Sequence, residues 1–139
     1  MAIIGFNITK ILAQKKSNQQ GKINVNNNVA INNVGISPLK LDPGKISLSF
    51  QFQFTSKYDP DIALISIEGE VLTLEEKEVG NKILEDWKKT KRLGKEVATP
   101  ILNNILSKCN IQAIILSRDV NLPPPVPLPK IEPKDTDKQ

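Results

Sequence analysis

The stretch from residue 46 to residue 58 alternates between apolar and polar side chains over most of its length. Its apolar positions share one parity and include three of the four phenylalanines of the chain, the full set being Ile46, Leu48, Phe50, Phe52, Phe54 and Tyr58. Successive side chains of a strand point to opposite faces, so this pattern predicts a long strand with one apolar and one polar face. That apolar face needs a cover, which could be the chain's own helices, a second copy or a client polypeptide.

Three further stretches have the same period of two. Residues 2–14 place Ile4, Phe6, Ile8 and Leu12 on one face. In residues 22–32, apolar residues alternate with asparagines, and because Asn is a poor strand former this strand is expected at an edge or with a solvated face. Residues 62–74 form the fourth strand. Four amphipathic strands joined by short links predict an antiparallel meander with one face covered.

The period changes to about 3.6 near Thr73, which predicts helices. The residues Thr73-Leu-Glu-Glu76 fit a capping box, and the first helix is expected to end near Gly94. A second helix follows from about Val97 or Pro100. The prolines between Leu122 and Ile131 predict an extended segment. It could be a ligand for a proline-recognising domain, but its interspersed apolar residues favour packing on its own domain. The fold class is therefore α+β, as one domain over residues 1–131 with a disordered charged tail at 132–139.

Composition narrows the function. The 139 residues contain no His and a single Cys, which removes the commonest general base, a disulfide within the chain and the usual metal ligands. We therefore expect neither catalysis nor a cofactor or metal. No stretch is long and apolar enough to span a membrane, and the N-terminus lacks the features of a signal peptide, so a cytoplasmic location is expected.

Three features could carry chemistry, and each also has a structural explanation. Glu68 and Glu70 point the same way on a strand, which suits paired carboxylates but also a solvated face. The cations of Lys88–Lys95 could bind nucleic acid, but without interleaved aromatic residues they fit a helix C-terminus better, and nucleic acid is not the expected partner. Cys109 lies on an apolar helix stripe and is expected to be a buried thiol.

The order of these elements resembles that of the SecB family of protein-export chaperones. The stretch Thr99-Pro-Ile-Leu-Asn-Asn-Ile-Leu-Ser-Lys-Cys-Asn-Ile111 resembles the long helix of that family, and Leu122-Pro-Pro-Pro-Val-Pro-Leu-Pro129 is similar to the proline-containing segment after it. The opening residues Met1–Lys10 and the region Gly21–Val29 resemble an archaeal, SecB-like branch.

The resemblance implies a homotetramer, assembled as a dimer of dimers, that holds unfolded or export-bound polypeptides along apolar grooves. It also implies docking to the translocation machinery. The candidate polypeptide-binding residues are Phe6, Phe50, Phe52, Phe54, Tyr58, Trp87 and Leu122. Unlike the family, the chain runs from Ile131 into a charged tail where the family has a short amphipathic helix. This departure favours the alternative of a non-catalytic protein specific for one partner on the same fold, and a weak nucleic-acid binder through Lys88–Lys95 is a further alternative.

Overall fold

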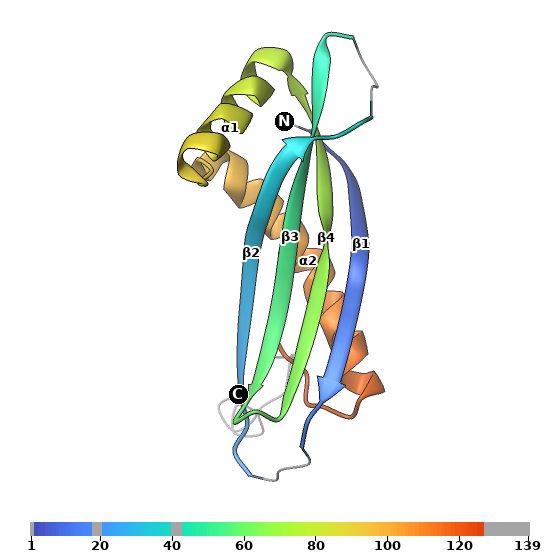
Figure 1. Ribbon diagram of the computed structural model, residues 1–139. Helices are drawn as coiled ribbons and strands as arrows, with labels where there is room; N and C mark the ends of the chain where they lie inside the picture. Colours follow the sequence, from blue (N-terminus) through green and yellow to red (C-terminus); the bar gives the residue numbers. More distant parts are fainter. Residues whose placement is uncertain (1, 18–20, 40–42, 127–139) are drawn as a thin grey trace, which may run out of the picture.

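A computed structural model describes residues 2–17, 21–39 and 43–126 of the chain (Figure 1). Its elements are β1 (Ala2–Lys15), β2 (Asn24–Ile36), β3 (Lys45–Asp59), β4 (Ala63–Glu76), α1 (Lys77–Thr90) and α2 (Lys95–Asp119). The four strands form one antiparallel sheet, and α2 runs obliquely across one face of it (Figure 1). The sheet followed by two helices confirms the predicted fold class. The tail expected at residues 132–139 lies outside the described residues.

The strand order in the sheet is β1-β4-β3-β2. The expected meander therefore holds for β2, β3 and β4, whereas β1 lies against β4 and not against β2. Burial explains this arrangement. Strand β4 is buried at most positions on both faces, as suits a central strand, while the Asn-rich β2 is mostly exposed and takes an edge. A simple meander would have placed β2 in the centre and β4 at an edge.

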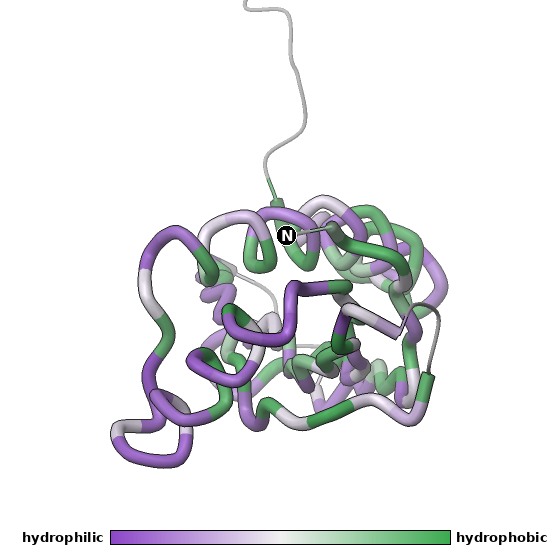
Figure 2. Tube along the Cα trace, turned by 90° about the horizontal axis from the view of Figure 1, so that it is seen from above, coloured by the Kyte–Doolittle hydropathy of each residue, from purple (hydrophilic) through white to green (hydrophobic). Residues whose placement is uncertain are grey.

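The core lies between the sheet and the helices. Phe50, Phe52 and Phe54 pair across the sheet with Val71, Gly69 and Ile67 of β4, so these side chains share the covered face. Helix α2 supplies a matching stripe of fully buried residues, namely Ile101, Ile105, Cys109 and Ala113. Figure 2, which looks along the strands, shows hydrophilic and hydrophobic positions alternating along the tube. The apolar face of β3 is thus covered by the chain's own helices.

The boundary between β4 and α1 corrects the predicted capping box. Strand β4 continues to Glu76, and Thr73 is fully buried opposite Leu48 of β3. Helix α1 begins only at Lys77 and has no side-chain cap. Glu75 is consequently buried at the end of the strand, where loss of hydration raises the pKa of its carboxyl group. Helix α2, by contrast, starts earlier than expected. It begins at Lys95, so that Pro100 lies inside the helix.

Both edge strands contain a β-bulge at the same level of the sheet. Strand β1 is irregular between Ile8 and Lys10, and β2 between Ile31 and Asn33. The bulges shift the parity of each strand, because the extra residue has no partner opposite it. In β1 this places Ile11 opposite Ile67 on the covered side and Leu12 opposite Ser66 on the other, which corrects the face predicted for Leu12.

Candidate polypeptide-binding groove

Most of the residues predicted to bind polypeptide lie in the core. Phe50, Phe52, Phe54 and Tyr58 are at most 1% exposed, so a client cannot reach them without opening the sheet–helix interface. Phe6 is half-buried, and its ring stacks on that of Phe52 at a centroid distance of 5.3 Å. The interpretation of the β3 phenylalanines as a binding surface is corrected to a hydrophobic core.

The proline-containing segment packs on the chain itself, as expected, over its described residues. The Tyr58 hydroxyl donates a hydrogen bond of 2.6 Å to the Pro123 carbonyl, and the Asn27 side-chain amide donates one of 2.8 Å to the Pro125 carbonyl. Leu122 is largely buried, with its backbone N–H bonded to the Ser117 carbonyl. Tyr58 of β3 and Asn27 of β2 therefore anchor the segment to the sheet, and Leu122 ties it to the end of α2. Residues 127–131 lie outside the described part.

Tyr58→Phe is expected to remove this anchor and to change the alkaline pH dependence of stability. At neutral pH the lost hydrogen bond should lower the free energy of unfolding by about 1 kcal/mol. Burial raises the pKa of Tyr58 from 10.0 to about 12, so the unfolded state ionises first and the wild type loses stability as the pH rises from 10 to 12. By pH 11 the wild type should lose roughly 1.4 kcal/mol that Tyr58→Phe does not lose. Urea titrations of both proteins at pH 8 and pH 11 measure the difference, and parallel losses would contradict the assignment.

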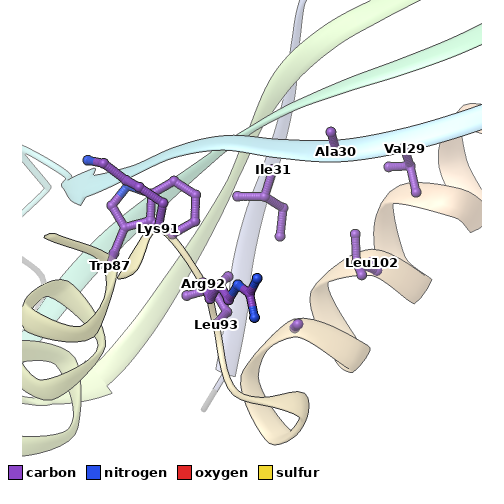
Figure 3. A pocket seen from close by; sticks show the side chains of 9 residues that line it. Val29, Ala30, Ile31, Trp87, Lys91, Arg92, Leu93 and Leu102 are labelled. Carbon is purple, nitrogen blue, oxygen red and sulfur yellow. The ribbon is translucent and has the colours of Figure 1, made fainter. Parts of the chain in front are cut away.

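A groove lies between the free edge of β2 and the turn that connects the two helices. We call it the β2 groove, and Val29, Ala30, Ile31, Trp87, Lys91, Arg92, Leu93, Ala98 and Leu102 line it. Its volume is about 180 Å³, enough for one or two side chains of an extended segment. Ile31 and Val29 point from β2 toward the helices, and Leu102 points back toward the strand from α2 (Figure 3). Of the residues predicted for binding, Trp87 is the one that lines this groove.

Strand β2 is suited to pair with a further strand. Among the described residues it forms one edge of the sheet and pairs with β3 alone. Edge strands of soluble proteins are commonly protected by charged residues, proline or bulges. Asn24–Ile36 contains no charged residue and no proline, and its pairing is regular from Asn24 to Ile31, before the bulge. An extended polypeptide can therefore add to β2 through backbone hydrogen bonds and place alternate side chains in the groove.

The mouth of the β2 groove is positively charged. Lys91 takes a left-handed conformation with φ of 56° at the end of α1, and its ammonium group lies 5.7 Å from the centre of the Trp87 ring. Arg92 follows directly and extends into the groove between Leu93 and α2 (Figure 3). Within the described ranges, the ion pairs of the chain involve Lys10, Lys16, Lys45 and Lys89, so neither Lys91 nor Arg92 has a carboxylate within 4.0 Å.

The other candidates have structural roles. Glu70 accepts hydrogen bonds from Ser49 at 2.8 Å and from Asn7 at 3.3 Å, and Glu68 forms an ion pair with Lys10 at 3.5 Å. Cys109 is fully buried, and burial raises the pKa of its thiol to about 11, which opposes formation of a nucleophilic thiolate. Across the described residues no group of three or more His, Cys, Asp or Glu side chains could hold a metal ion.

A second apolar surface lies at the opposite edge of the sheet. Five β1 side chains, Ile3, Ile4, Ile8, Ile11 and Leu12, are 36–46% exposed. On α2, Ile111 is 63% and Ile115 is 41% exposed. Single exposed apolar residues are ordinary, whereas a run of them along one edge strand is less common.

Comparison with known proteins supports the fold. No family model and no curated protein sequence matches the chain. Among solved structures, it is similar to the Mycobacterium tuberculosis Rv1957 SecB-like chaperone, determined in complex with a ChAD peptide from the Rv1956 HigA1 antitoxin, with a TM-score of 0.52 and 11% sequence identity over 94% of this chain and 88% of that one. At this level of identity the match concerns the fold, and the chain has a SecB-like fold. Among the helices of the described residues, none could cross a membrane.

Proposed function

We propose that this protein is a SecB-like chaperone that binds unfolded or export-bound polypeptides and has no catalytic activity of its own. The observation that carries the proposal is the β2 groove, in which a strand edge without charged residues or proline lies beside a largely apolar pocket on a SecB-like fold. Backbone pairing along an edge is largely independent of sequence, which suits a protein with many clients. The absence of His and the single buried Cys also favour binding over catalysis and are compatible with a cytoplasmic location.

The proposal is tested by the aggregation of an unfolded model client in the presence of the purified protein. The wild type should keep the client soluble, and Ile31→Ser together with Leu102→Ser should weaken this effect several-fold because the pocket loses apolar contacts. Val79→Ser is the matched control, since Val79 is exposed on α1 and does not line the groove. A wild type that leaves aggregation unchanged would contradict the chaperone proposal and, if one partner dominates in pull-downs, would favour a dedicated-partner role.

We also propose that the protein is a homo-oligomer assembled as a dimer of dimers, with docking to the translocation machinery as a further step. The exposed isoleucines of β1 and α2 support self-association, because their burial between subunits would remove apolar surface from water. Ile11→Lys combined with Ile111→Lys should yield smaller species in light scattering coupled to size exclusion. Ile36→Lys is the control, because Ile36 is 65% exposed on the other edge strand. A monomeric wild type would contradict the assembly.

A further inference from the structure

We infer that the β2 groove selects acidic, extended polypeptide segments, with a carboxylate bound by Lys91 and Arg92 beside an apolar side chain in the pocket. This inference deepens the proposed function and rests on it, because it names the chemistry of the segment that the groove prefers. A polypeptide segment is the occupant that combines a backbone for the β2 edge, an apolar side chain and a negative charge.

The end of α1 explains only part of the positive charge near the groove. Cations in the last turn of a helix complement its dipole, and this accounts for Lys88 and Lys89. Lys89 is also paired with Glu85 at 2.9 Å, an interaction that lowers the pKa of that carboxyl group. Lys91 is the C-cap residue of α1 and Arg92 is the next residue, and both side chains line the pocket. Within the described part of the chain they have no carboxylate at ion-pair distance, so their charge is available to a ligand.

The backbone fixes where these two cations lie. The Lys91 N–H donates to the Trp87 carbonyl at 2.9 Å, and the Arg92 N–H donates to the Thr90 hydroxyl at 3.2 Å. These bonds end α1 and direct the next two side chains to the mouth of the groove. An Arg guanidinium binds a carboxylate through two parallel hydrogen bonds, which gives this position preference for an acid over an amide.

Trp87 contributes its ring to the apolar part of the wall (Figure 3). Its indole N–H is buried, so a bound segment contacts the ring and not this donor. The apolar neighbours Ile31, Leu93 and Leu102 complete a pocket for one aliphatic or aromatic side chain next to the acid.

The test measures binding of three labelled peptides by fluorescence anisotropy at low salt. The peptides share one alternating apolar pattern and carry Glu, Gln or Lys at the polar positions. We expect the Glu peptide to bind about tenfold more tightly than the Lys peptide, because two partly solvated charge contacts favour the acidic peptide. The Lys91→Glu/Arg92→Glu double variant should remove or invert this order. Lys22→Glu/Lys57→Glu changes the net charge equally at exposed positions outside the groove and should preserve it.

Each other outcome overturns the inference. Equal binding of the Glu and Gln peptides, both weakened by Ile31→Ser/Leu102→Ser, would leave polypeptide binding intact and remove the acidic preference. If the wild type bound none of the peptides but still suppressed client aggregation, the inference alone would be wrong. If the wild type showed neither activity, the proposed function would be wrong as well. A single-stranded oligonucleotide that displaces the Glu peptide, and binds through Lys91 and Arg92 with a steeper salt dependence, would identify the surface as a nucleic-acid site.

Discussion

Replacing Phe52 with alanine is expected to lower the free energy of unfolding by about 3 to 5 kcal/mol, a large share of the stability of a domain this size. The Phe52 side chain is 1% exposed and lies at the centre of β3, opposite Gly69. Its removal leaves a cavity that the paired strands cannot close, because β3 is held by β2 on one side and β4 on the other. Urea unfolding followed by circular dichroism measures the loss.

Phe6→Ala is the matched control for Phe52→Ala. It also removes one phenyl ring of the stacked pair, but from a half-buried position on the edge strand β1. Folding removes less of the Phe6 ring from water, and the edge strand can relax around the substitution. The free energy of unfolding is therefore expected to fall by only about 1 to 2 kcal/mol. If Phe52→Ala proved as mild as Phe6→Ala and instead abolished client binding, Phe52 would belong to a binding surface, and the assignment to the core would be wrong.

The sequence predicts the sheet well because its strands are long and their period is regular. On β3, Leu48, Phe50 and Phe54 are all fully buried, as the parity of the stretch indicates. The asparagines of β2 correctly indicate an edge strand. The same residues also argue against a simple meander, in which β2 would lie in the centre of the sheet.

Local patterns fail where pairing between distant residues decides the outcome. Thr73 and Glu76 fit a capping box, yet β3 and β1 pair with this stretch, and β4 continues to Glu76, two residues beyond the predicted end. The backbone hydrogen bonds to two neighbouring strands outweigh those that a helix cap would form locally. In β1, the face to which alternate side chains point likewise changes at bulges, and the sequence of β1 does not predict these bulges.

The candidate site is less predictable than the fold. A phenylalanine on an alternating strand is equally compatible with a core and with an open groove, and only the path of α2 settles which it is. The β2 groove combines Ile31, Arg92 and Leu102, which are far apart in the sequence. One signal was available beforehand, because Asn24–Ile36 lacks the charged residues and proline that usually protect an edge strand.

Gly69→Ala is expected to destabilise the protein by about 2 to 3 kcal/mol, although it adds a single methyl group. A Cβ at this position would lie 2.9 Å from Cζ of Phe52 and 3.0 Å from Cα of Ile8, and it would overlap the Asn7 carbonyl oxygen. Two of these three obstacles belong to the backbone of β1, so the added methyl group must push the edge strand away from β4 at the level of its bulge. Chemical denaturation gives the change in stability, and hydrogen exchange should show faster exchange of the β1 amides that pair with β4.

Gly35→Ala separates this steric effect from the general consequence of replacing glycine in a strand. Gly35 lies on β2, and a Cβ there would have no atom within 4 Å. Alanine restricts the unfolded chain at both positions, so Gly35→Ala should be neutral or stabilising by up to about 1 kcal/mol. Opposite signs for the two variants would show that the close approach of β1 to β4 requires glycine at position 69. Similar small effects at both positions would mean that β1 is free to move away from the sheet, in which case the Phe6–Phe52 stack could not be a fixed part of the core.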